Sequence, residues 1–144
     1  MSVLLDANAL IALLWPPHEH HDAMRNWFRH HAAKGWATTA LTQGAFVRIV
    51  SQPAFAGRSI PINETAGLLL RNLAHPQHGL LPLDFGFDAV IDACSGGLLG
   101  HRQITDAWLL TAAIRHNAQL LTFDADLPQL LADPTERSRH ILVL

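Results

Sequence analysis

Short β-prone segments alternate with longer segments of helical periodicity along the whole chain, and this alternation limits its fold more than any other feature. The expected strands are residues 2–5, 36–40, 79–83, 118–123 and 140–144. The expected helices are residues 18–35, 42–51, 63–75, 86–100 and 104–117. Strands that are separated by helices pair in parallel, because the crossover returns the chain to the same end of the sheet. The sequence therefore predicts a three-layer α/β/α fold around a central, mainly parallel sheet.

Local signals predict the ends and the buried faces of two helices. In the helix expected from residue 18, Ala23, Trp27 and Phe28 should face inward, and Gly35 should end the helix. Asn63 is expected to cap the helix that starts there, because its side chain can accept a hydrogen bond from an unpaired backbone N–H of the first turn.

Size and composition indicate one domain over residues 1–144, because 144 residues with 49% hydrophobic types can form a single sizeable core. The formal net charge of -2 gives no overall basic field, so any nucleic acid would have to be bound locally. We expect a cytoplasmic protein without a membrane partner, since no targeting pattern or spanning apolar run is found. The single cysteine, Cys94, cannot form an internal disulfide and is expected to be a buried apolar residue.

Three aspartates follow or begin predicted elements at positions that can share one edge of the sheet. Asp6 directly follows the first strand, and Asp124 directly follows the strand predicted at 118–123. Asp106 lies in the first turn of the helix predicted at 104–117. Ligand sites in open parallel sheets form at the carboxyl ends of the strands, so these three side chains are expected to converge.

Each aspartate also has a structural explanation. Asp6 can act as an N-cap between strand and helix, and Asp106 can favour the helix dipole. Asp124 can close a turn after its strand. The joint pattern favours a site, because carboxylates a few ångströms apart repel one another unless a cation neutralises them. Oxygen ligands without cysteine select Mg²⁺ or Mn²⁺, and such ions support hydrolysis of phosphodiester bonds.

Four segments of the chain carry a resemblance to a known family. These are LLDANALIALLWP, TTALTQGAFVRIVSQPAF, GHRQITDAWLLTAAIRH and AQLLTFDADL. In this order they resemble the successive motifs of PIN-domain proteins, specifically the VapC-type toxins of bacterial toxin–antitoxin pairs. The resemblance implies a PIN-like fold and a Mg²⁺- or Mn²⁺-dependent ribonuclease that cuts cellular RNA. It also implies a homodimer that is inhibited by a cognate VapB-like antitoxin.

The resemblance also assigns roles to single residues. It places the catalytic and metal-binding roles on Asp6, Asp106 and Asp124, which fall on the acidic positions of the family. Roles in supporting the site or contacting the substrate fall on Asn8, Thr105 and Thr122.

The chain departs from the family pattern at Gln43, where many PIN nucleases carry a glutamate. An amide has no charge and cannot act as a base, so the alternative is a PIN-like RNA- or protein-binding module with weakened or lost catalysis. Asp126 either supplies the missing carboxylate or caps the turn that follows it. Arg48 resembles a family arginine and either contacts an RNA phosphate or forms a structural ion pair.

A cluster of histidines near the N-terminus has no assigned role. His18, His20, His21 and Asp22 lie close enough in sequence to suggest zinc, but no later segment completes a ligand set at a recognisable spacing. Their role is left open.

Overall fold

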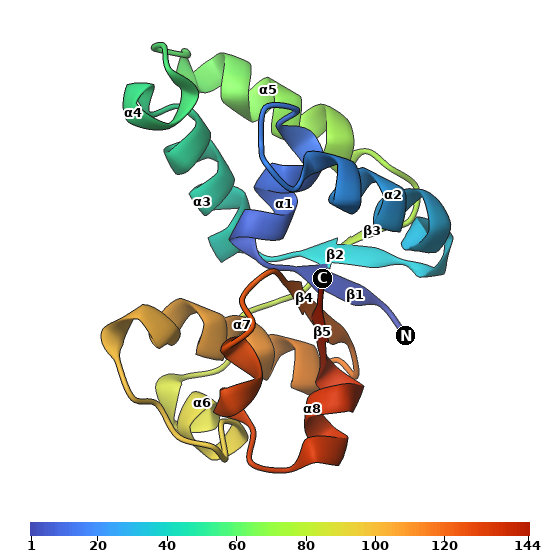
Figure 1. Ribbon diagram of the computed structural model, residues 1–144, viewed down its shortest axis with the longest axis vertical. Coiled ribbons are helices and arrows are strands. Elements are labelled where there is room, and N and C mark those ends of the chain that lie inside the picture. Colours follow the sequence, from blue (N-terminus) through green and yellow to red (C-terminus); the bar gives the residue numbers. More distant parts are fainter.

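Five parallel strands form a single sheet at the centre of the computed structural model, which describes residues 1–144 (Figure 1). The strands are β1 (Val3–Leu5), β2 (Trp36–Thr38), β3 (His78–Leu80), β4 (Gln119–Thr122) and β5 (Ile141–Val143). Their order across the sheet is β3-β2-β1-β4-β5, and all neighbouring pairs run parallel. The predicted parallel sheet is confirmed.

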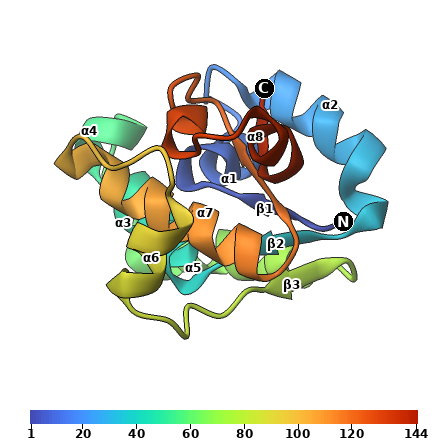
Figure 2. The same cartoon turned by 90° about the horizontal axis from the view of Figure 1, so that it is seen from below.

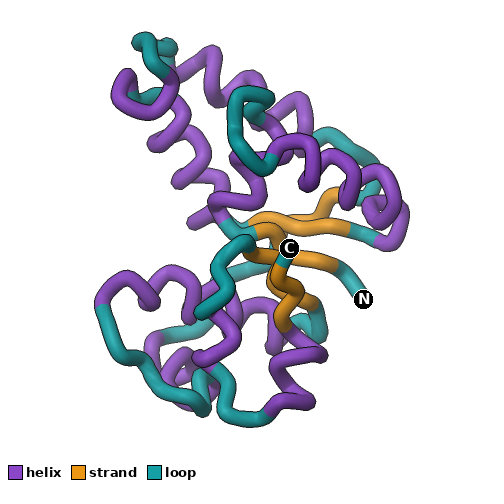
Figure 3. Tube along the Cα trace, in the orientation of Figure 1, coloured by secondary structure: helices purple, strands orange, loops and turns teal.

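Helices cover both faces of this sheet. One face carries α1 (Ala7–Leu14), α2 (His21–His31), α3 (Ala40–Val50), α4 (Pro53–Ala56) and α5 (Ile62–Leu73), which lie above the sheet in Figures 1 and 3. The other face carries α6 (Phe87–Ala93), α7 (Ile104–Arg115) and α8 (Pro134–His140), and Figure 2 shows α7 between the other two. Three 3₁₀ turns complete the structure: η1 (Ala32–Lys34), η2 (His101–Gln103) and η3 (Leu127–Leu130). The predicted three-layer α/β/α fold is confirmed.

The protein has two hydrophobic cores, one on each face of the sheet, because successive side chains of a strand point to opposite faces. Val3 and Leu5 pack into the core under α1 and α2, whereas Leu4 packs into the core under α7. On β4, Leu121 packs into the first of these cores and Leu120 into the second. A strand that is buried on both faces is apolar at every position, which explains why these segments show no polar alternation. No helix is both long and apolar enough to cross a membrane.

Helix α1 is apolar all round and is correspondingly buried from Ala9 to Leu14. It begins immediately after Asp6 and ends before Pro16, because the residue that precedes a proline is driven out of the helical conformation. Trp15 accordingly has an extended backbone. The first helix thus starts at the end of the central strand, which places Asp6 at the junction.

Two of the predicted helix details are wrong. Helix α2 begins at His21 rather than at residue 18, so its inward face shifts by one position. Met24 and Trp27 are buried, whereas Ala23 is exposed. Asn63 does not cap α5, because Pro61, with its preset φ of -58°, already stands at the cap position and the helix starts at Ile62.

The segment after α6 packs closely against η3. The helix ends at Ala93 and not near residue 100, and Cys94 is buried beneath it as expected. Gly96 then donates its backbone N–H to the Leu130 carbonyl (2.9 Å), and an added Cβ at this glycine would overlap the carbonyl oxygen of Gln129. The pair of glycines in the sequence therefore marks a close backbone approach.

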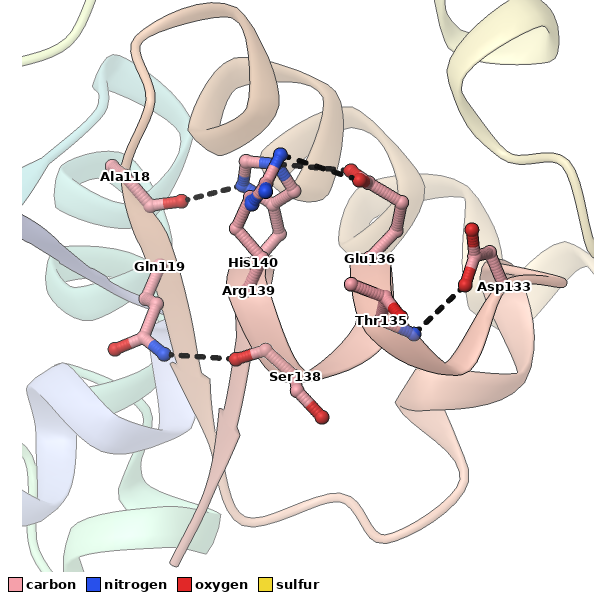
Figure 4. A network of polar contacts seen from close by, with 8 residues as sticks. All are labelled: Ala118, Gln119, Asp133, Thr135, Glu136, Ser138, Arg139 and His140. Carbon is pink, nitrogen blue, oxygen red and sulfur yellow. Dashed lines mark hydrogen bonds and ion pairs between the residues drawn. The ribbon is translucent and has the colours of Figure 1, made fainter.

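Helix α8, which the sequence did not predict, is joined to β4 by side-chain hydrogen bonds (Figure 4). Buried His140 is hydrogen-bonded through Nδ1 to the Ala118 carbonyl (3.0 Å), and its Nε2 lies 3.4 Å from Glu136. Gln119 donates to the Ser138 carbonyl (3.3 Å). These contacts hold the end of α8 where the chain enters β5, so they set the position of the last strand beside β4.

Candidate active site

The order of the strands reverses between β1 and β4. From β1 the chain builds β2 and β3 on one side, and it then crosses to build β4 and β5 on the other. The connections that leave β1 and β4 therefore run in opposite directions and open a crevice at the carboxyl ends of these strands. Asp6 directly follows β1, and Asp124 lies two residues beyond the end of β4.

Asp6 is the most rigidly held of the three aspartates. Its Oδ1 accepts a hydrogen bond from the Ala9 N–H (2.7 Å), and its own N–H donates to the Leu121 carbonyl (3.1 Å). Burial raises the pKa of Asp6, and the charge of Asp124 adds to this, while hydrogen bonds from Thr122 and Ala9 act in the opposite direction. The side chain therefore caps α1 and also presents a carboxylate at the sheet edge.

Asp106 couples electrostatically to both other acids. It lies half-buried in the first turn of α7. Burial and then the charges of Asp6 and Asp124 raise the pKa of Asp106 to about 6. Mutual repulsion of this kind requires the three carboxylates to lie near one another, so the structure brings together the three acids that the sequence singled out.

Asp124 is exposed and shapes its own turn. Its N–H donates to the Thr122 hydroxyl (3.0 Å), and its Oδ1 accepts from the Asp126 N–H (2.9 Å). Asp126 is also exposed and stands at the start of η3, with its Oδ1 3.5 Å from the Gln129 amide nitrogen. Both earlier explanations of Asp124, a turn residue and a member of the acidic group, thus apply together.

The acids line two adjoining depressions. One, of about 330 Å³, is bordered by all three aspartates and by Asn8 and Thr122, with an apolar wall formed by Ile49 and Phe55. The second, of about 190 Å³, shares Asp106 and Asp124 and adds Asp126 and Arg102. The larger depression is an open, acidic pocket with one apolar side.

Three of the other predicted site residues border neither depression. The Gln43 amide nitrogen donates to the Thr38 hydroxyl (3.0 Å) at the end of β2, and that hydroxyl also bonds His78 Nε2 (2.8 Å). Arg48 is exposed on α3 and forms no ion pair, so a structural ion pair does not explain it. Thr105 is exposed at the start of α7.

The histidine cluster makes three separate contacts and no zinc site. His18 is hydrogen-bonded to Asn8, His20 stacks on Phe123 with ring centroids 4.3 Å apart, and His21 bonds the Ala12 carbonyl. The segment that carries these rings therefore borders the acidic pocket through Asn8. The contact between His18 and Asn8 could not be predicted from the sequence, because the two residues lie ten positions apart and follow no recognisable spacing.

The apolar wall of the pocket was also missed. Phe55 belongs to the one-turn helix α4, which has Pro53 in its first turn and ends at Gly57 in the left-handed conformation (φ 77°). Proline at the start and glycine at the end are recognisable helix signals, so α4 itself could have been found. Nothing in the sequence shows that Phe55 and Ile49 face the acids.

No three His, Cys, Asp or Glu side chains form an assembled set of metal ligands in the structure. The donors that border the pocket nevertheless suit a hard divalent cation, because they are carboxylates that repel one another. Asp106 is half-buried and Asp124 is exposed, whereas Asp6 is buried and held by the Ala9 N–H.

Comparison with known proteins gives consistent matches over most of the chain. A family model described as PIN domain matches residues 3–131. Ribonuclease VapC38 of Mycobacterium tuberculosis is 41% identical over 122 residues, which cover 85% of this chain and 84% of the relative. Ribonuclease VapC44 of the same organism is 34% identical over 146 residues and all of both chains. The crystal structure of VapBC2 from Rickettsia felis, bound to a DNA fragment from their promoter, matches with a TM-score of 0.65 at 17% identity, over 91% of this chain and 96% of that one, and shows a shared fold.

Proposed function

The chain belongs to the PIN-domain family as a VapC-type member, and on that premise we propose that it is a metal-dependent endoribonuclease toxin. It would hydrolyse RNA phosphodiester bonds and be neutralised by a VapB-like antitoxin. The observation that carries the proposal is the meeting of Asp6, Asp106 and Asp124 where the strand order reverses. Relatives that share 34–41% identity over most of the chain are named ribonucleases.

In this proposal Asp6, Asp106 and Asp124 hold Mg²⁺ or Mn²⁺. The polar side chains that border the pocket are three carboxylates, an amide and a hydroxyl, and this supports the choice, since both ions prefer oxygen ligands. When bound, a divalent ion supplies positive charge that offsets the charge of the phosphate and activates water for attack at phosphorus.

The chain's own residues prepare the site for this chemistry. Asp6 is held in place by the Ala9 N–H, so its carboxylate is oriented before any substrate arrives. Without a metal, burial and the charges of Asp6 and Asp124 raise the pKa of Asp106 to about 6, so a bound cation would favour the ionised carboxylate that ligates it. Phe55 is partly exposed at the rim and offers a flat apolar surface on which a base can stack.

The same proposal includes protein partners. Exposed apolar side chains on α3, α4 and α5, namely Leu41, Phe55, Ile62 and Leu70, are the kind of surface that binds another protein. VapBC2 of Rickettsia felis is a toxin–antitoxin complex with the same fold. We propose that this surface binds a VapB-like antitoxin and a second copy of the chain, so that the protein forms a homodimer.

RNA cleavage by the purified protein tests the proposed activity. We expect cleavage with Mn²⁺ or Mg²⁺, loss of cleavage in EDTA, and loss in Asp6→Asn. Asparagine caps a helix as well as aspartate does, so this variant keeps the fold. Asp84→Asn is the matched control, because Asp84 lies exposed in a loop outside the pocket. Cleavage that survives both EDTA and Asp6→Asn would refute the proposal.

A wild-type protein that binds RNA but cleaves none with either metal would favour the binding module instead. Gln43 is the residue that motivates this alternative, because its uncharged amide faces Thr38 at the neighbouring strand. Growth arrest on expression, relieved by the product of the adjacent antitoxin gene, would support the proposed toxin function over the binding module.

A further inference from the structure

A chain of hydrogen bonds runs from the segment before α2 to the rim of the acidic pocket. The His20 backbone N–H donates to His18 Nδ1 (3.0 Å). His18 Nε2 lies 2.8 Å from Oδ1 of Asn8, a residue that borders the pocket together with the three aspartates.

These hydrogen bonds determine which ring nitrogen of His18 carries the proton. A backbone N–H can only donate, so His18 Nδ1 must carry a lone pair and accept. The proton of a neutral ring is then on Nε2, which must donate to an acceptor, and Asn8 Oδ1 is that acceptor. Burial lowers the pKa of His18, and the charges of His20 and His21 add to this while the charge of Glu19 acts in the opposite direction, so the neutral ring is favoured.

The orientation of the Asn8 amide follows from the imidazole. Because Oδ1 is bonded to His18, the amide NH₂ group is the part of the side chain that remains available, and it makes no hydrogen bond within the protein. Asp6, Asp106 and Asp124 offer only acceptors when ionised. Asn8 therefore brings a hydrogen-bond donor to a pocket whose other polar groups are mainly acceptors.

We propose that His18 is a positioning residue, which orients the Asn8 amide so that its NH₂ group donates to a phosphate oxygen of the RNA. The inference rests on the proposed ribonuclease function and deepens it. A phosphodiester presents only acceptors at its non-bridging oxygens, so the NH₂ group of Asn8 would add a donor contact to the charge that a bound cation supplies. The stacking of His20 on Phe123 and the His21 contact with Ala12 hold the His18 segment in place.

Steady-state cleavage of one defined RNA with Mn²⁺ tests the proposal. The contact is made in the ground state and the transition state alike, so its loss should raise KM and leave kcat nearly unchanged. We expect Asn8→Ala to raise KM about 10- to 100-fold, the range for one hydrogen bond to a charged group. His18→Ala should raise KM by about 3- to 10-fold, since the amide is then free to turn.

Three further variants separate orientation from general damage. His18→Gln should stay close to wild type, because its amide nitrogen can take the place of Nε2 as donor. Asn8→Asp keeps an acceptor for His18 but has no NH₂ group, and should be at least as impaired as Asn8→Ala. The double variant should have the same KM as Asn8→Ala alone. His30→Ala is the control, because His30 is exposed on α2 and lies outside the pocket.

Additive effects in the double variant, or full activity of Asn8→Asp or of His18→Ala, would overturn the proposal. Nitrogen-15 NMR supplies a readout that needs no turnover. We expect the Nε2–H tautomer at His18, and a shift of the Asn8 side-chain amide signals in His18→Ala. A wild-type protein that cleaves no RNA would refute the proposed function, whereas a protonated or Nδ1–H ring at His18 would refute the positioning role.

Discussion

Replacing Asp106 by asparagine should stabilise the metal-free protein at neutral pH. Burial and the charges of Asp6 and Asp124 raise the pKa of Asp106 from 3.8 to about 6. A shift of this size corresponds to an upper limit of ~3 kcal/mol against the folded state with Asp106 ionised. The side chain is partly exposed, so solvent screening reduces the expected gain to ~1–2 kcal/mol. For a chain of this length the Tm should rise by about 3–6 °C.

The gain should depend on pH in a defined direction. The folded-state pKa lies above the unfolded value of 3.8, so the folded chain binds more protons than the unfolded chain between pH 3.8 and about 6. Wild-type stability therefore increases as the pH falls through this window. Above it, Asp106 is ionised in the folded protein and the full cost of that charge applies. Asparagine does not titrate, so the advantage of Asp106→Asn should be largest above pH 7 and should disappear near pH 4.

Thermal unfolding in EDTA, followed by circular dichroism at pH 7.5 and pH 4.5, measures this gain. Saturating Mn²⁺ should then reverse the order at pH 7.5, because a ligand at 100 times its Kd stabilises the wild type by ~2.7 kcal/mol. Asp84→Asn, in an exposed loop, should show neither effect. An Asp106→Asn protein that is no more stable than wild type in EDTA at pH 7.5, or a gain that persists unchanged at pH 4.5, would refute the reasoning.

The remaining predictions concern other parts of the chain. Gln43→Glu should strengthen Mn²⁺ binding by less than about tenfold, because it adds a distant carboxylate to the sheet edge; unchanged affinity in calorimetry would show that a charge at position 43 does not act on the acidic pocket. Gly96→Ala should cost about 2 kcal/mol or more in urea unfolding, since its Cβ overlaps the Gln129 carbonyl. Gly44→Ala, with open space around its Cβ in α3, should instead gain up to about 1 kcal/mol. Leu110→Ala should cost about 2–5 kcal/mol, because Leu110 is fully buried, and a smaller loss would show that the core collapses around it.

The centre of the sheet could be predicted because β1, β2 and most of β4 are buried on both faces. Segments such as Val3–Leu5 are apolar throughout, and the helices between them enforce parallel pairing. Helix α8 was not predictable in this way, since it has seven residues and is held by contacts such as that of His140 with Ala118 (Figure 4). The start of α2 was misplaced because the chain remains in a turn as far as His20.

The acidic residues of the candidate site could be placed because each stands at the end or the start of a predicted element. Asp6 and Asp124 follow strands, and that position alone assigns them to one edge of the sheet. The surroundings of the acids depend on contacts between residues without a fixed spacing. The bond between His18 and Asn8, and that between Gln43 and Thr38, are of this kind.

The dependence of RNA cleavage on Mn²⁺ concentration tests whether the three aspartates form a working metal site. We expect no cleavage in EDTA, a saturable increase with Mn²⁺ for the wild type, and a midpoint at least about tenfold higher for Asp124→Asn, because the metal loses one of three charged ligands. The exposed-loop control Asp84→Asn should follow the wild-type curve. A cleavage rate that is independent of Mn²⁺, or identical curves for the wild type and Asp124→Asn, would show that these carboxylates do not bind a catalytic metal.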